Sequence, residues 1–128
     1  MKRVFIFETT DNSRKIATEV LQNSGFEVFS MNLDNQNLYN LKKNDPDLVI
    51  INSSESIMEN CLNLIQELKA IYNNKTVPVI LAGNVSDYNG YFFDPLNPQY
   101  YWPIDDFIEA DCSNKEFLHK VNLLINSD

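Results

Sequence analysis

The sequence predicts a single α/β domain built around a parallel five-stranded sheet. Short apolar runs with the composition of strands alternate with segments of helical periodicity, which is typical of βα units. The run Leu48–Ile51 is continuously apolar, as a central strand covered on both faces must be. A length of 128 residues lies within the usual size of one domain. We therefore expect one domain over residues 1–128 with a doubly wound (βα)5 architecture.

The first half of the chain supplies three predicted strands and two predicted helices. Asp11, Asn12 and Ser13 offer N-cap side chains to the first helix, and Gly25 ends it at a position that favours glycine. Leu38 and Leu41 are the apolar positions of a short second helix, over residues 34–43. The three strands are expected at Arg3–Phe7, Phe26–Ser30 and Leu48–Ile51.

The second half contains the strongest helical pattern and a capped final helix. Apolar residues recur at intervals of three and four across residues 56–72, which predicts a long amphipathic helix that includes Cys61 in its apolar stripe. Ser113 and Glu116 have the spacing of a capping box and precede the apolar positions of a final helix. Strands are expected over residues 77–82 and at Phe107 and Ile108.

The segment between the last two predicted strands is irregular. Three of the five prolines stand at positions 95, 98 and 103, so a long helix across residues 92–104 is not expected. An aromatic- and proline-rich loop therefore replaces or shortens the fourth helix. This loop either packs on its own domain or forms an exposed patch that binds a partner. It holds seven of the chain's fifteen aromatic residues: Tyr88, Tyr91, Phe92, Phe93, Tyr100, Tyr101 and Trp102.

Composition excludes several classes of function. A formal net charge of -8 repels nucleic-acid backbones, so no nucleic-acid partner is expected. The apolar runs are too short to cross a bilayer, which takes roughly 18 residues or more. Cys61 and Cys112 stand far apart without metal-binding spacing, so neither a disulfide framework nor a zinc site is expected. We expect a cytoplasmic protein with no membrane contact and no cofactor.

Several segments carry a family resemblance. Residues 46–52 read Pro-Asp-Leu-Val-Ile-Ile-Asn, where receiver domains of bacterial two-component response regulators typically have Pro-Asp-Leu-Val-Leu-Leu-Asp. The order of motifs resembles these receivers over essentially the whole chain, and it implies their flavodoxin-like topology. Further matching segments are Glu8-Thr9 with Arg14 six residues after Glu8, Val77–Ile80, and Asp105–Ile108 before a capped helix.

The departures from the family fall on the phosphorylation chemistry that the resemblance implies. Asn52 stands at the position of the aspartate that accepts the phosphoryl group, and an amide is a poor nucleophile. Thr9 replaces one of the two acidic Mg²⁺ ligands, which leaves Glu8 alone. Gly83 falls where the family has a hydroxyl, and Ala110 where it has a lysine. These positions together predict a degenerate phosphorylation pocket without a metal.

Each of these residues also has a structural interpretation. Asn52 at a strand end could serve only to cap the following loop. Glu8 could be a solvated or paired carboxylate, or it could hold a residual metal ion. Cys112 is either an inert residue or a reactive thiol beside the pocket. His119 is expected on the surface of the last helix, since no motif places a serine or cysteine beside it.

We therefore expect a pseudo-receiver of bacterial signalling, which acts by phosphorylation-independent protein–protein interaction and is not an enzyme. Its partner would be a signalling or regulatory protein, or a second copy of the chain. The expected interaction surface joins the aromatic loop to Phe107 and the last helix. The alternative is a small-ligand sensor at the carboxyl ends of the strands. Its site would be lined by Glu8, Thr9, Asn52, Ser53, Ser54 and Gly83.

Overall fold

The fold is a five-stranded parallel sheet with helices on both faces. The computed structural model describes residues 2–8, 14–32, 35–41, 44–52, 77–83, 105–109 and 112–126. The sheet has the strand order β2-β1-β3-β4-β5, and every neighbouring pair is parallel. The elements are β1 (Arg3–Glu8), α1 (Arg14–Asn23), β2 (Glu27–Asn32), α2 (Asn35–Leu41), β3 (Leu48–Asn52), β4 (Val79–Gly83), β5 (Asp106–Glu109) and α4 (Asn114–Ile125).

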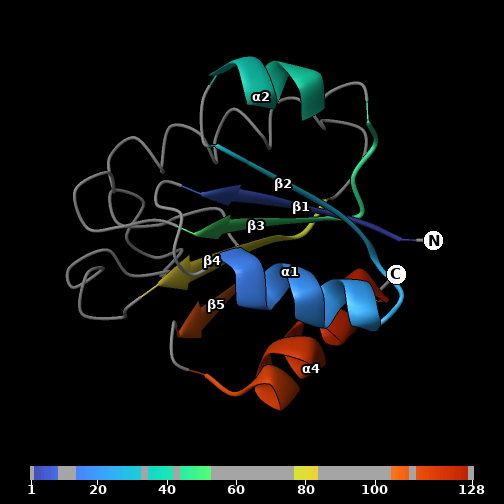
Figure 1. Cartoon of the computed structure of the whole chain (residues 1–128), viewed down its shortest axis with the longest axis vertical. Helices are drawn as coiled ribbons and strands as arrows, with labels where there is room; N and C mark the ends of the chain where they lie inside the picture. The colour runs from blue at the N-terminus through green and yellow to red at the C-terminus, as the bar shows by residue number, and fades with distance from the viewer. Residues whose placement is uncertain are drawn as a thin grey trace, which may run out of the picture.

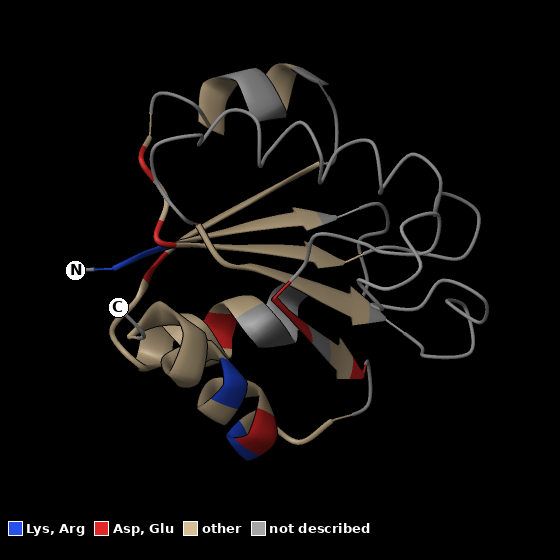
Figure 2. Cartoon of the chain, turned by 180° about the vertical axis from the view of Figure 1, so that it is seen from behind, with Lys and Arg blue, Asp and Glu red and all other residues tan. Residues whose placement is uncertain are grey.

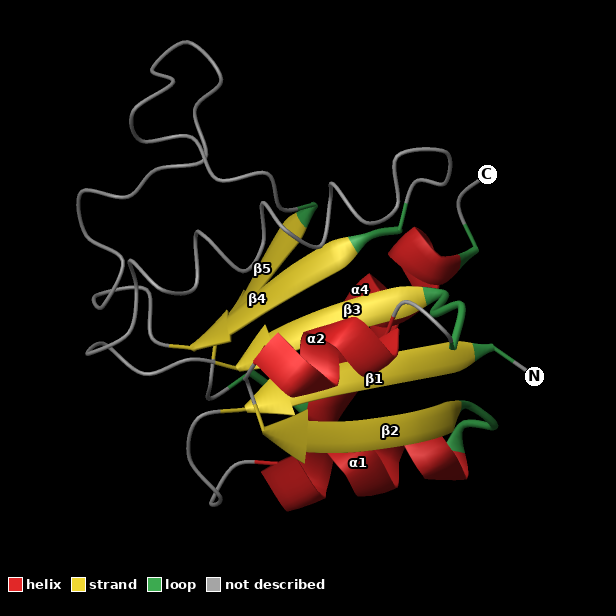
Figure 3. Cartoon of the chain, turned by 90° about the horizontal axis from the view of Figure 1, so that it is seen from above, coloured by secondary structure: helices red, strands yellow, loops and turns green. Residues whose placement is uncertain are grey.

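The described helices lie on opposite sides of the sheet. Figures 1 and 3 show α1 and α4 together under one face and α2 over the other. On the first face, even-numbered strand residues such as Ile6 and Ile50 pack with Leu21 of α1 and Val121 of α4. The odd-numbered residues of the same strands point to the opposite face and are also buried: Phe5, Phe7, Val49, Ile51, Val79 and Leu81. Burial on both faces explains why these strands are continuously apolar.

The ends of α1 and α4 confirm two predictions made from single residues. Gly25 follows α1 with a positive φ of 92°, a left-handed conformation that residues with a Cβ rarely adopt. Its N–H donates to the carbonyl of Gln22 at 3.1 Å and thereby closes the last turn. At the start of α4, the Ser113 hydroxyl accepts a hydrogen bond from the Glu116 N–H at 3.1 Å. This bond satisfies one of the amides that a helix start leaves without an intrahelical acceptor.

Two aspartates fix the amino ends of neighbouring strands in the same way. Asp47, immediately before β3, accepts from the Arg3 N–H at 2.8 Å and donates its own N–H to the Arg3 carbonyl. Asp105, immediately before β5, accepts from the Val79 N–H at 2.7 Å and donates to the Val79 carbonyl. We call them the strand-start aspartates. Each pairs its strand reciprocally with the neighbouring strand and so helps to set the register of the sheet.

The observed boundaries differ from the predicted ones by one or two residues at every strand: β1, β3 and β4 each end one residue later, β5 extends by one residue at both ends, and β2 and β4 also begin later. β2 begins one residue later than predicted and continues through Met31 and Asn32, because the polar end of β2 still pairs with the end of β1. β4 begins at Val79 rather than at Val77. Pro78 has no N–H for the ladder, although its carbonyl accepts from the Val49 N–H at 3.0 Å. The predicted helix over residues 56–72 and the aromatic loop lie outside the described residues.

Candidate functional site

The carboxyl ends of the five strands lie together at one end of the sheet, which we call the carboxyl edge. They bring together residues that are distant in the sequence. In register, Asn52 is the neighbour of Glu8 on one side and of Ala82 on the other. Glu8 is also the register partner of Asn32, and Gly83 that of Glu109. The strands end in two carboxylate residues, two asparagines and one glycine. In open parallel sheets, this is the edge where ligands bind.

Asn52 occupies the centre of this edge. It ends β3, the middle strand of the sheet, and its side chain is half-buried. Because side chains alternate along a strand, Asn52 lies on the same face as Leu48 and Ile50, the face that α1 and α4 cover. A half-buried amide at this point can donate and accept hydrogen bonds, but it carries no charge.

The structure brings three of the predicted pocket residues to one edge. Glu8, Asn52 and Gly83 end β1, β3 and β4 respectively. Thr9 and Ala110, the other two predicted pocket residues, lie outside the described residues, as do Ser53 and Ser54 of the alternative site.

The predicted interaction surface is described in part. Phe107 lies in β5 as expected and pairs with Leu81 in the sheet register. The seven aromatic residues between positions 88 and 102 lie outside the described residues. On α4, Leu123 is exposed at 59% and is the most exposed large apolar side chain in the described part of the chain.

The residues that end the described strands differ in charge from those at the opposite end of the sheet. None of the residues that end the strands is basic, and Glu109 ends β5 with a carboxylate (Figure 2). Lys2 and Arg3 stand at the start of β1, at the opposite, amino end of the sheet, whereas Lys115 and Lys120 belong to α4. Arg14, at the start of α1, is the next basic residue in the chain after Arg3.

The described residues contain no cluster that favours a metal. Over these parts of the chain, no group of three or more His, Cys, Asp and Glu side chains could hold a metal ion. None of the helices in the same segments has the length and apolar character that a bilayer crossing requires. Cys112 is a partly buried free cysteine that packs against the core between sheet and helices.

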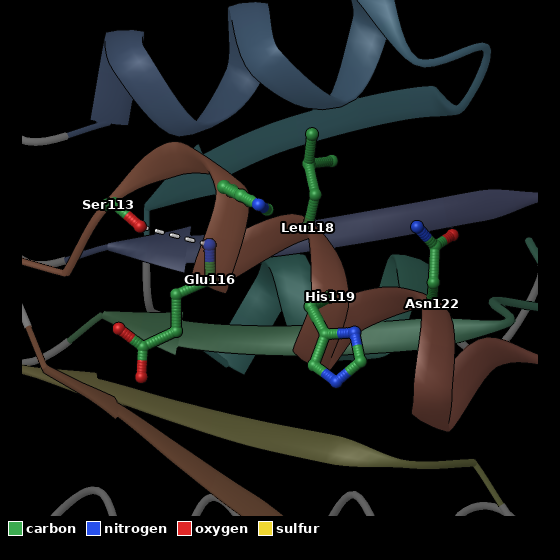
Figure 4. A pocket seen from close by; sticks show the side chains of 6 residues that line it. Ser113, Glu116, Leu118, His119 and Asn122 are labelled. Carbon is green, nitrogen blue, oxygen red and sulfur yellow. Dashed lines mark hydrogen bonds between the residues drawn. The ribbon is translucent and has the colours of Figure 1, made fainter.

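An open groove of about 630 Å³ runs along the surface of α4. It was not predicted from the sequence. Figure 4 shows Leu118 directed toward α1, in agreement with its packing against the core. His119 is exposed, as predicted. Individually these residues look like the surface of any amphipathic helix, so only the folded shape reveals the groove. Its described lining consists of Ser113, Lys115, Glu116, Leu118, His119 and Asn122.

The strand order and the layers define the class of fold: this is the open α/β fold of response-regulator receiver domains. Three solved structures illustrate the similarity. Chemotaxis protein CheY4 of Vibrio cholerae matches with a TM-score of 0.73 at 15% identity, over 97% of this chain and 98% of that one. The receiver domain of a signal transduction histidine kinase from Syntrophus aciditrophicus matches with a TM-score of 0.71 at 18% identity, over 100% and 96%.

A third similar structure is a receiver-modulated diguanylate cyclase from Pelobacter carbinolicus. Its TM-score is 0.71 at 23% identity, over 98% of this chain and 92% of that chain. Neither a protein-family model nor a curated protein matches the sequence. The similarity therefore lies in the fold, and the predicted parallel five-stranded α/β architecture of receiver type is confirmed.

Proposed function

We propose that the chain is a pseudo-receiver, a signalling module that binds a partner protein without being phosphorylated. The observation that carries this proposal is the position of Asn52. It ends the central strand of a receiver-type sheet, in register with Glu8, where the family resemblance expects the phosphorylated aspartate. The chain thus has the receiver-type sheet, but an amide, Asn52, stands where the carboxylate that accepts the phosphoryl group is expected.

The neighbouring strand ends support the same conclusion. Phosphoryl transfer needs positive charge around the transferred group, supplied by metal ions and basic side chains. Here β5 ends in Glu109, beside Gly83 of β4, and Gly83 has no hydroxyl to bind a phosphoryl oxygen. By the resemblance, Ala110 follows where a lysine would stand. By the same resemblance one of the two acidic metal ligands is also replaced, at Thr9. Carboxylates at the described ends of β1 and β5, without that ligand and the lysine, oppose the binding of a phosphoryl group.

The proposed partner surface combines β5 and α4 with residues that lie outside the described part of the chain. It consists of the aromatic residues between positions 88 and 102, Phe107 and the exposed part of α4. Leu123 supports this assignment, because it exposes 59% of its surface on a helix whose other large apolar residues face the core. Aromatic and apolar anchors contribute most of the binding energy in many protein interfaces.

The test is to incubate the protein with acetyl phosphate and Mg²⁺, followed by intact-mass and amide-spectrum measurements. We expect neither the mass of an added phosphoryl group nor shifts at the strand ends. A response-regulator receiver that has the phosphorylatable aspartate is treated in parallel, to show that the reagent is active. A stable phosphoryl adduct on this chain would refute the proposal.

One observation favours a second function, the small-ligand sensor. The chain runs from β1 to β2 on one side and reaches β3 on the other, so β1 and β3 flank the point where the strand order reverses. Glu8 and Asn52 end these two strands. A thermal-shift screen against nucleotides, divalent metals and quinones tests this alternative. Saturable stabilisation that is lost in Asn52→Leu would favour the sensor over the interaction module.

A further inference from the structure

The two outermost strands of the sheet, β2 and β5, differ in how well they are protected against pairing with another chain. β5 is an edge strand of four residues, two of them charged, and Asp106 lies 3.8 Å from Lys120 of α4. Short, charged strands resist pairing with another chain. β2, the opposite edge, has six residues and pairs without interruption along β1. It contains no lysine, no proline and no bulge, which are three of the usual devices that prevent edge pairing, and its one charged residue, Glu27, is at its start.

The open part of the β2 edge is confined to its middle. The Glu27 N–H bonds to the Lys2 carbonyl, so by alternation the backbone groups of Val28 and Ser30 point away from the sheet. At each end of β2, one outward backbone group is already bonded within the chain. The Phe26 N–H donates to the Leu21 carbonyl, and the Asn32 carbonyl accepts from the Asn37 side chain at 2.6 Å.

The side chains of β2 favour an apolar partner strand. Phe29 is half-buried and stacks on the buried ring of Phe5, with ring centroids 4.7 Å apart. Its outer side remains partly exposed, as does Met31 two residues further on the same face. Glu27 is the one charged residue in β2, and it lies 3.7 Å from Arg3 of the same sheet. An added strand would therefore cover apolar surface without meeting an unpaired charge at the centre.

We propose that β2 is the pairing edge for a second copy of this chain, which adds antiparallel to it. With Phe29 opposite Phe29, the outward backbone groups of Val28 meet those of Ser30 in the other copy, and those of Ser30 meet Val28. The two phenylalanines then extend the aromatic stack from Phe5 across the interface. Glu27 faces Met31, so the arrangement opposes no like charges although each chain carries a net charge of -8.

This self-complementarity is the reason to assign the edge to a second copy rather than to another protein. A two-fold axis through the Phe29 pair satisfies all the open groups at the middle of both edges at once. The interface is separate from Asn52 and from the partner surface proposed above, so either proposal can fail without the other.

Sedimentation equilibrium over a wide concentration range tests the proposal. Ser30→Pro removes an outward N–H that makes no bond within the sheet, so the fold should survive while dimerisation weakens by at least about tenfold. Ser30→Ala is the matched control: it keeps the N–H and should dimerise like the wild type. A chain that stays monomeric throughout, or a Ser30→Pro variant that dimerises as well as Ser30→Ala, would overturn the proposal.

Amide hydrogen exchange on the wild-type protein keeps the test independent of the variants. As the concentration rises, protection should increase at the Val28 and Ser30 amides and stay constant at Phe29 and Met31, whose amides point into the sheet. A dimer that leaves Val28 and Ser30 unprotected would place the interface elsewhere. If protection of these amides appears only when a different protein is added, the partner of β2 is that protein and not a second copy. This result would equally overturn the proposal.

Discussion

Replacing the strand-start aspartates by alanine should destabilise the fold unequally, although the two make the same kind of bond. Asp105 accepts from Val79 at 2.7 Å and Asp47 accepts from Arg3 at 2.8 Å. The difference lies in the donors. The bond to Val79, a residue that is 1% exposed, is partly buried, whereas the bond to Arg3 is exposed. Water can therefore replace Asp47 more easily than it can replace Asp105.

The expected magnitudes follow from these contacts. A hydrogen bond to a charged acceptor contributes about 1.5–3 kcal/mol, and an unsatisfied buried amide costs about 1–3 kcal/mol. Because the Asp105 side chain itself is near the surface, we expect about 2 kcal/mol for Asp105→Ala, in the lower half of the first range. For Asp47→Ala we expect about 1 kcal/mol, since the Arg3 amide can be hydrated. At this size of domain, 2 kcal/mol lowers the melting temperature by roughly 7 °C.

Urea unfolding followed by circular dichroism measures both variants. The dependence of the unfolding free energy on urea should be unchanged, so that the shift in midpoint reports stability. Asp105→Asn is the matched control, because its amide oxygen can still accept from Val79, and it should recover more than half of the loss. Equal losses in Asp47→Ala and Asp105→Ala would refute the reasoning from burial, as would a loss below about 0.5 kcal/mol at Asp105.

Substitutions at four further positions test the helices, each by thermal unfolding. Ser113→Ala should cost about 1 kcal/mol because the Glu116 N–H loses its cap, and Ser113→Asp, which keeps an acceptor, should cost much less. Gly25→Ala should cost about 1 kcal/mol through its positive φ alone, since no atom lies within 4 Å of an added Cβ; Gly25→Asn should cost less. Val121→Ala should cost about 1–3 kcal/mol because Val121 is 0% exposed, whereas Leu123→Ala, at 59% exposed, should change stability by less than about 0.5 kcal/mol. Equal costs for the last pair would contradict the assignment of the core.

The elements that could be predicted from the sequence are those fixed by local chemistry. The continuously apolar run before Asn52 predicted β3, and single residues such as Gly25 and Ser113 predicted helix ends, because each acts on its own turn of backbone. The bonds of the strand-start aspartates could not be predicted in this way. Asp47 reaches Arg3 across 44 positions, and Asp105 reaches Val79 across 26, so both depend on the strand order.

In the candidate site, too, local features could be predicted from the sequence and contacts between strands could not. The place of Asn52 at the end of β3 could be predicted because it follows from a local motif. Its register with Glu8 and Ala82, and the register of Gly83 with Glu109, depend on how the strands assemble. The open middle of the β2 edge was equally invisible in the sequence. It depends on which backbone groups α1 and Asn37 already satisfy, and these are tertiary contacts.

The most direct measurement of the central claim is phosphoryl transfer to Asn52→Asp. This variant supplies an aspartate at position 52 and leaves Thr9, Gly83 and Ala110 unchanged. It therefore distinguishes a pocket that lacks only the aspartate from one that lacks the other groups as well. With acetyl phosphate and Mg²⁺, the proposal predicts no stable adduct by intact-mass measurement, because by the family resemblance Thr9, Gly83 and Ala110 stand where the second acidic ligand, the hydroxyl and the lysine would be. A phosphorylated Asn52→Asp variant would contradict the account, since it would show a working receiver pocket that lacks a single residue.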